Sequence, residues 1–188
     1  DHVRKVADRV SQLETERGIA PGAVRLIAML ESPAALLLAR EIATASPRMA
    51  GLTLGMEDYA TTMGTTPNAD LLRPACYQIT QAARAAGIAP LAVPASMANF
   101  RDAEEMESAA GWARRIGAVG GYAVHPVQVE ILNRVFAPSE EEIAWAHRVV
   151  EAAAKAKREG AGVFTVDGKM VDLPIITRAQ DIMRRQAD

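Results

Sequence analysis

The sequence contains very little of the residue types that mark several large functional classes. Its 188 residues include one cysteine, Cys76, so no disulfide can form within the chain, and only 4% of the residues are aromatic. No apolar run approaches the roughly 20 residues that a membrane-spanning helix requires. We therefore expect no membrane segment, and the cysteine count fits a reducing compartment, the cytoplasm or an organelle matrix.

Neither sign of charge dominates the sequence. Twenty-one lysine and arginine residues stand against 23 aspartate and glutamate residues, which gives a formal net charge of −2. No basic run is interleaved with aromatic residues, as it would be in a nucleic-acid-binding surface. The composition excludes a nucleic-acid partner, and with 49% hydrophobic residues the chain can bury a sizeable core.

What the sequence does contain is a repeated alternation of short apolar runs and amphipathic segments. Strands are expected to begin near residues 25, 51, 90 and 119. A spacing of about one βα unit is typical of a parallel sheet covered by helices, so we predict an α/β fold. Helices are predicted over residues 3–16, 33–45, 71–86, 102–116, 126–136 and 139–158.

The pattern changes after residue 136. Ser139 and Glu142 form a capping-box pattern at the start of one helix. The dipeptide Asp167-Gly168 between two short apolar runs predicts a β-hairpin with a type I′ turn, and Pro174 begins a terminal helix. We therefore divide the chain into barrel units over residues 1–136 and a smaller module of hairpin and helices over 137–188.

Four βα units do not close a (β/α)8 TIM barrel, which needs eight strands and typically about 250 residues. The sequence is either the C-terminal half of such a barrel or an open four-stranded sheet. Half a barrel would expose two parallel strand edges, which proteins avoid. The chain also begins at Asp1, without an initiator methionine or a leader-like segment. We favour the half barrel and expect an upstream portion to precede it.

Acidic residues follow the first two predicted strands. Glu31 comes directly after the first strand, and Glu57 and Asp58 follow the second. The carboxyl ends of parallel strands meet at one edge of the sheet, and Mg²⁺ binds through one or two protein carboxylates. The same acids also stand where helices begin, and helix dipoles favour carboxylates there without any ligand. Position alone leaves metal binding and helix capping both open.

Two further side chains invite a chemical role. His125 follows the fourth predicted strand, where it either contacts a substrate or caps the helix that begins at Pro126. Cys76 lies within a predicted helix and has no histidine nearby in the sequence. We predict that Cys76 is a packed side chain and not a nucleophile.

Seven segments, taken together in order and spacing, point to a known family. They are Ile27–Pro33 (IAMLESP), Ala39–Arg48 (AREIATASPR), Leu54–Tyr59 (LGMEDY), Ala82–Gly87 (AARAAG), Val124–Gln128 (VHPVQ), Val135–Ser139 (VFAPS) and Asp167–Asp172 (DGKMVD). With these segments the chain resembles the citrate lyase β-subunit and malyl-CoA lyase family of the HpcH/HpaI aldolase superfamily. The resemblance covers nearly the whole chain and implies the C-terminal part of a TIM barrel.

The resemblance also implies the residues of the site. Glu31 and Asp58 would bind Mg²⁺; apart from the resemblance, we also expect Glu31 and His125 to contact the substrate. Asp172 would be the catalytic acid/base, on a lid that reaches the site of a neighbouring subunit. This arrangement implies a homo-oligomer, a trimer or a hexamer.

The implied reaction is a Mg²⁺-dependent retro-Claisen or retro-aldol cleavage of a hydroxyacyl-CoA, such as a citryl, malyl or citramalyl thioester. Its small-molecule partners are an acyl-CoA and a 2-oxo acid. Three alternatives remain open at this point: a CoA-independent 2-oxo acid aldolase, an acyl-CoA thioesterase, and a citrate lyase β subunit that depends on a partner protein. The fold does not distinguish them, because barrels host unrelated chemistries.

Overall fold

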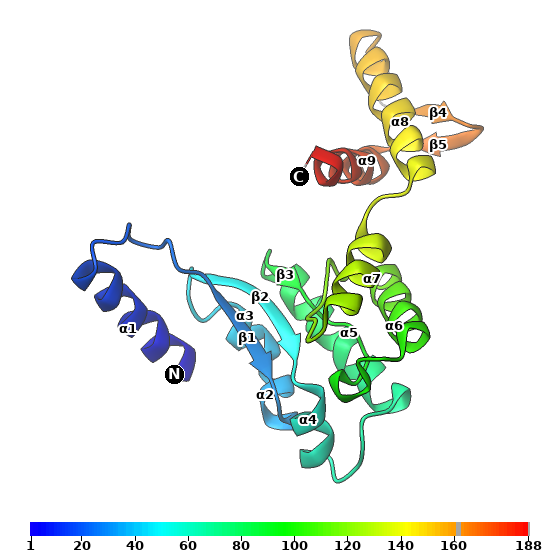
Figure 1. Cartoon of the computed structure of the whole chain (residues 1–188). Coiled ribbons are helices and arrows are strands. Elements are labelled where there is room, and N and C mark those ends of the chain that lie inside the picture. Colours follow the sequence, from blue (N-terminus) through cyan, green and yellow to red (C-terminus); the bar gives the residue numbers. More distant parts are fainter. Residues whose placement is uncertain (161–162, 188) are drawn as a thin grey trace. The chain divides into compact units, whose positions relative to one another are not determined.

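The computed structural model describes residues 1–160 and 163–187, and the chain divides into two compact units. The first unit spans residues 1–136 and the second spans residues 137–188 (Figure 1). None of the helices in the described ranges has the length and hydrophobicity needed to span a lipid bilayer.

The first unit is built around a parallel sheet of three strands in the order β1 (Leu26–Leu30), β2 (Met49–Leu54) and β3 (Ala89–Pro90). Helices make the connections: α2 (Pro33–Leu37) and α3 (Ala39–Ala43) join β1 to β2, and α4 (Met56–Thr62) and α5 (Ala69–Ala85) join β2 to β3. Parallel strands need such crossovers, and the predicted α/β class is confirmed.

One face of this sheet carries the core. Helices α3 and α5 pack against this face (Figure 1). Leu30 of β1, Leu52 of β2 and Ile79 of α5 are at most 1% exposed. On the opposite face of β1, the side chains of Ile27 and Met29 are each 46% exposed. Parallel strands are usually covered on both faces, so this apolar face is unusual for an isolated sheet.

The predicted fourth strand, residues 119–124, is wrong. These residues have no regular strand structure, and the Val119 N–H donates a 3.0 Å hydrogen bond to the Pro90 carbonyl at the end of β3. The N–H groups of Val124 and His125 donate instead to the side-chain oxygen of Gln128, at 2.9 and 3.2 Å. The Gln128 side chain therefore satisfies backbone N–H groups that would otherwise need a neighbouring strand as their hydrogen-bonding partner.

The helices otherwise follow the predicted segments with two differences. The helix predicted over residues 33–45 is broken at Leu38, where the Gln78 side chain donates a 2.8 Å hydrogen bond to the Leu36 carbonyl. A side chain that binds a helix carbonyl commonly interrupts the helix. Helix α4 and the short 3₁₀ helix η1 (Met97–Asn99) were not expected, whereas α6 (Ala103–Arg115) and α7 (Pro126–Phe136) were, and these two pack together.

The second unit is a helix, a hairpin and a helix: α8 (Glu140–Arg158), β4 (Phe164–Val166), β5 (Lys169–Val171) and α9 (Leu173–Ala187). The Ser139–Glu142 capping box is present as predicted. Asp167 and Gly168 have φ values of 52° and 73°, which are the positive angles that a type I′ turn requires. Val149 and Val171 lie in the small apolar core of this unit.

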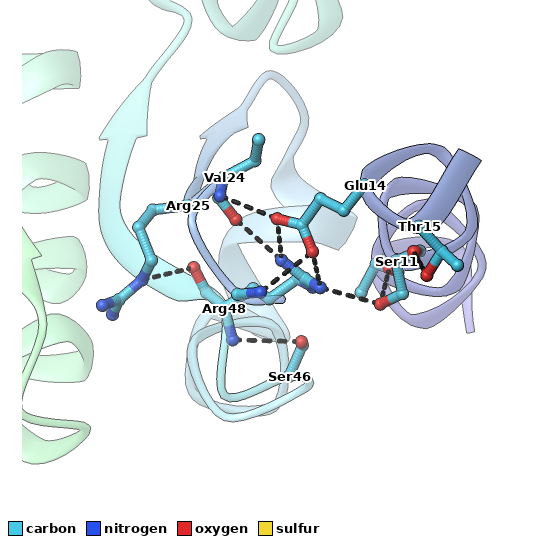
Figure 2. Close-up of polar contacts among 9 residues, drawn as sticks. Ser11, Glu14, Thr15, Val24, Arg25, Ser46 and Arg48 are labelled. Atoms are coloured by element: carbon cyan, nitrogen blue, oxygen red, sulfur yellow. Dashed lines mark hydrogen bonds and ion pairs between the residues drawn. The ribbon is translucent and has the colours of Figure 1, made fainter. Parts of the chain in front are cut away.

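A buried ion pair ties α1 (His2–Glu16) to the residue before β2 (Figure 2). The Glu14 side chain accepts hydrogen bonds from both terminal nitrogens of Arg48, at 2.8 and 2.5 Å. It also accepts the backbone N–H groups of Gly22 and Val24, at 2.9 and 2.8 Å. Led by the Arg48 hydrogen bond, these contacts lower the pKa of Glu14 to about 2.

Replacing Glu14 with glutamine is expected to lower the thermal unfolding midpoint by several degrees, because it leaves the Arg48 guanidinium without its carboxylate. The folded-state pKa of Glu14, about 2, lies below its ordinary value of 4.5. The stabilisation is therefore present above pH 4.5 and is lost as the pH falls towards 2. Thermal unfolding curves measured across this pH range should show that the difference in midpoint between wild type and Glu14→Gln becomes smaller as the pH falls.

The matched control is Glu16→Gln on the same helix, where an exposed carboxylate lies 3.4 Å from Arg9. Exposed pairs contribute little to stability, so this change should leave the midpoint nearly unaltered at every pH. A difference between wild type and Glu14→Gln that does not change with pH would contradict this assignment of the ion pair.

Candidate metal and substrate site

The carboxyl ends of β1 and β2 meet at one edge of the sheet. Leu30 and Leu54 are register partners at the last position of each strand, and the Gly55 N–H donates to the Leu30 carbonyl at 2.9 Å. The residues that follow the two strands are therefore neighbours in space. This edge is where ligand sites form in parallel α/β proteins.

The Glu31 side chain lies next to Gly55, the first residue after β2. A Cβ atom built on Gly55 would lie 2.9 Å from Oε1 of Glu31, so the glycine provides the room that this side chain occupies. The Glu31 side chain is exposed, and its carboxylate has no hydrogen bond or ion pair with any residue that the structure describes.

Asp58 lies in the first turn of α4. Met56 and Tyr59 anchor this helix in the core, with 7% and 6% of their surface exposed. The Asp58 carboxylate is exposed and, within the described ranges, also lacks a hydrogen-bonding or ionic partner. Its neighbour Glu57 differs, because it accepts a 2.5 Å hydrogen bond from the Ser96 hydroxyl.

Neither open carboxylate is a side-chain cap, and both have the oxygen chemistry that suits Mg²⁺. The side-chain cap of α2 is Ser32, whose hydroxyl accepts the Ala35 N–H at 3.2 Å, and α4 has no side-chain cap at all. Over residues 1–160 and 163–187, no cluster of three or more His, Cys, Asp or Glu side chains could hold a metal. Magnesium needs only one or two protein carboxylates and completes its shell with water and substrate oxygens. Glu31 and Asp58 are the side chains that would hold it.

His125 caps α7, which is one of the two roles considered for it. Its Nδ1 accepts the Val127 N–H at 3.3 Å, and its ring stacks on Phe100 with the centroids 5.0 Å apart. Because Nδ1 is an acceptor, a neutral ring carries its proton on Nε2. A substrate contact at Nε2 remains a prediction.

Asp172 lies in the second unit between β5 and α9. Its backbone carbonyl accepts the N–H groups of Ile175 and Ile176, each at 3.1 Å, so α9 begins here. The carboxylate is half-buried and has no polar partner among the residues described. The proton-transfer role of Asp172 also remains a prediction.

Cys76 is a packed core residue, as predicted. Its side chain is 0% exposed, and burial raises the pKa of the thiol to about 12. A thiolate nucleophile at this position is therefore excluded near neutral pH.

Two buried polar residues, Gln128 and Thr53, were not predicted from the sequence. Gln128 is 2% exposed and fixes the turn before α7 through its two backbone bonds. Thr53 is 2% exposed and donates a 2.7 Å hydrogen bond to the Leu91 carbonyl, which joins β2 to the segment after β3. A polar residue between two apolar residues of a buried strand, as in Leu52-Thr53-Leu54, is the sequence pattern that could have indicated the buried Thr53.

Comparisons with known proteins identify the family of this chain. The model of the family described as HpcH/HpaI aldolase/citrate lyase matches residues 1–126. The chain is 38% identical to citrate lyase subunit beta of Haemophilus influenzae over 178 residues, which cover 94% of this chain and 60% of that protein. It is 34% identical to L-malyl-CoA/beta-methylmalyl-CoA lyase of Rhodobacter capsulatus, over 86% of this chain and 56% of that protein.

A solved structure is similar as well. The protein CitE from Mycobacterium tuberculosis, in complex with magnesium, acetoacetate and coenzyme A, superposes with a TM-score of 0.70 at 30% identity. The match covers 97% of this chain and 74% of that one. The chain spans no more than 60% of the length of the two relatives named above.

Proposed function

Because this chain belongs to the HpcH/HpaI aldolase/citrate lyase family, we propose that it is part of a Mg²⁺-dependent carbon–carbon lyase that cleaves a hydroxyacyl-CoA thioester. The products would be an acyl-CoA and a 2-oxo acid. The names of the two relatives and the magnesium, acetoacetate and coenzyme A bound to the related structure support this class of substrate.

The observation that carries the proposal is the pair of open carboxylates after β1 and β2. Glu31 and Asp58 come from adjacent strand ends, and the described residues provide no partner for either. When bound, Mg²⁺ would supply Lewis-acid polarisation of a substrate oxygen. The work left to the chain is to hold that ion, to orient the substrate and to move a proton.

We assign the proton transfer to Asp172. In the cleavage direction the substrate hydroxyl loses its proton and becomes the carbonyl of the 2-oxo acid. The electrons of the broken carbon–carbon bond pass to the α-carbon of the acyl-CoA, which then takes up a proton. Asp172 would accept the first proton and return one to carbon. We propose that it does so in the site of a neighbouring subunit, within a homo-oligomer.

We also propose that the sheet of the first unit is the later part of a (β/α)8 barrel, with about four βα units in this chain. In the described sheet, β1 pairs with β2 alone, so one of its edges is free. The exposed face of Ile27 and Met29 on the same strand is apolar. Further strands of a barrel would cover both, as the burial of parallel sheets requires.

The reaction is tested by incubating the full-length protein with Mg²⁺ and malyl-, citramalyl- or citryl-CoA and identifying the products. An acyl-CoA together with a 2-oxo acid supports the proposal. Free CoA with an intact hydroxy acid would mean a thioesterase. Cleavage restricted to substrates without CoA would mean an aldolase, and cleavage restricted to a carrier-bound thioester would mean a partner-dependent citrate lyase β subunit.

Gly55→Ala provides a separate test of the site. The new Cβ would displace the Glu31 side chain, so we expect Mg²⁺ affinity measured by calorimetry to fall about tenfold. The backbone angles of Gly55, φ −84° and ψ 90°, are open to alanine, so the thermal midpoint should hardly change.

The control for this variant is Gly111→Ala in α6, where the nearest atom to a new Cβ is Arg115 Nη1 at 3.6 Å, an ordinary contact. It should leave Mg²⁺ binding unaltered and stabilise the helix by up to about 1 kcal/mol. Equal Mg²⁺ affinity in Gly55→Ala and wild type would place the ion away from Glu31.

A further inference from the structure

Three acidic residues, Glu31, Glu57 and Asp58, follow the ends of β1 and β2 in the sequence, and of these Glu57 has a side-chain hydrogen-bonding partner, Ser96. We propose that Ser96 holds Glu57 away from the cation, so that the site offers two carboxylates and selects Mg²⁺ over Ca²⁺. This inference rests on the proposed magnesium site of Glu31 and Asp58. It assigns Ser96 and Glu57 as a pair that sets the number of protein ligands.

The first support is the hydrogen bonding of Ser96. Its hydroxyl donates to Oε1 of Glu57 at 2.5 Å and accepts the Ala98 N–H at 3.2 Å. Ser96 is the N-cap of η1, so the second bond fixes the hydroxyl to the loop that follows β3. The Glu57 carboxylate is thereby joined to an element outside the β1–β2 edge.

The second support is the geometry of α4. Glu57 and Asp58 are consecutive residues in its first turn, so their Cα atoms are about 3.8 Å apart and an unrestrained, flexible Glu57 side chain could turn towards an ion held by Asp58. Met56 and Tyr59 are buried on either side of this pair in the sequence, which fixes the rotation of the helix. Glu57 is then joined to Ser96, while Asp58 remains without a polar partner in the described part of the chain.

The number of carboxylates at the site affects which divalent cation it binds more tightly. Mg²⁺ is bound through one or two carboxylates and keeps several waters, whereas Ca²⁺ takes six to eight oxygen ligands and gains from each added carboxylate. A freed Glu57 has a flexible side chain next to Asp58 and could supply one or two further oxygens. Loss of the Ser96 hydroxyl should therefore favour Ca²⁺.

The experiment is calorimetric titration of the full-length protein with Mg²⁺ and, separately, with Ca²⁺. In Ser96→Ala we expect the Ca²⁺ affinity to rise about tenfold relative to the Mg²⁺ affinity. The double variant Ser96→Ala with Glu57→Gln should return the ratio to the wild-type value, because the gain requires the Glu57 carboxylate. Glu57→Gln alone should change little, since a glutamine oxygen still accepts the Ser96 hydrogen bond.

Two controls separate this role from general damage. Ser96→Thr keeps the hydroxyl and should retain the wild-type ratio. Ser108→Ala changes a serine that lines the same pocket as Ser96 and should have no effect on either ion. Thermal unfolding of each variant establishes that it is folded.

The outcomes separate the two proposals. If wild type binds Mg²⁺ through Glu31 and Asp58 but Ser96→Ala leaves the ratio of Ca²⁺ to Mg²⁺ affinity unchanged, the role of Ser96 is overturned and the magnesium site stands. If wild type does not bind Mg²⁺, or Glu31→Gln and Asp58→Asn bind it equally well, the site itself is overturned and the role of Ser96 falls with it.

Discussion

Replacing Asp58 with asparagine is expected to lower turnover of a hydroxyacyl-CoA substrate about a thousandfold, because a catalytic metal supplies several kcal/mol of transition-state stabilisation. Asparagine keeps the size of the side chain and removes the charge that a hard divalent ion requires. Helix α4 is held by the buried Met56 and Tyr59, so the variant should stay folded. Steady-state turnover at saturating substrate measures the effect.

Asp70→Asn is the matched control for Asp58→Asn. Asp70 is also an exposed acid in the first turn of a helix, α5, and is not a proposed metal ligand. If Asp58 acted only on the helix dipole, both variants would behave alike and lose a few tenths of a kcal/mol of stability at most. Equal turnover of the two variants would therefore contradict a metal-binding role for Asp58.

Replacing Asp172 with asparagine is expected to lower turnover by about 10²- to 10⁴-fold, the usual contribution of a positioned acid or base. The Mg²⁺ affinity should stay at the wild-type value, because Asp172 is not a proposed metal ligand. This split between turnover and metal binding distinguishes Asp172 from Asp58. A fall in Mg²⁺ affinity with unchanged turnover would contradict the assignment.

The hairpin itself provides the control for Asp172→Asn. Asp167 sits in the turn with a positive φ of 52°, an angle that asparagine adopts well, and its carboxylate pairs with Arg148 at 2.9 Å. Asp167→Asn should therefore preserve the hairpin and most of the turnover. A loss as large as that of Asp172→Asn would mean that disturbance of the hairpin, and not proton transfer, explains the effect.

Mixing the two inactive variants tests whether Asp172 acts in a neighbouring subunit. Subunits of Asp172→Asn keep the metal ligands, and subunits of Asp58→Asn keep Asp172. If Asp172 acts in trans, mixed oligomers contain some complete sites and activity returns after subunit exchange. If activity stays absent in oligomers that have demonstrably mixed, Asp172 does not act across subunits.

The parts of the fold that depend on local pattern could be predicted. The apolar runs that became β1 and β2, the Ser139 capping box and the Asp167-Gly168 turn are each decided by a few neighbouring residues. Residues 119–124 look equally apolar, but their conformation depends on Gln128 and on the short strand β3. That dependence lies outside the segment, so its own pattern could not reveal it.

The candidate site shows the same division. Strand order alone brings Glu31 and Asp58 to one edge, so the sequence could predict their proximity. The bond between Glu57 and Ser96 joins residues 39 apart in the sequence, and the Glu14–Arg48 pair joins residues 34 apart. Each depends on which loops the sheet brings together. Glu14 does interrupt the apolar stripe of its helix, which is a visible hint of a buried partner but does not identify it.

Calorimetric titration of Mg²⁺ tests most directly whether Glu31 and Asp58 hold a magnesium ion. The titration compares wild type, Glu31→Gln and Asp58→Asn, each with and without glyoxylate or pyruvate. We expect wild type to bind one Mg²⁺ more tightly when the oxo acid is present, and both variants to lose this binding. Unchanged Mg²⁺ binding in both variants would contradict this role of Glu31 and Asp58.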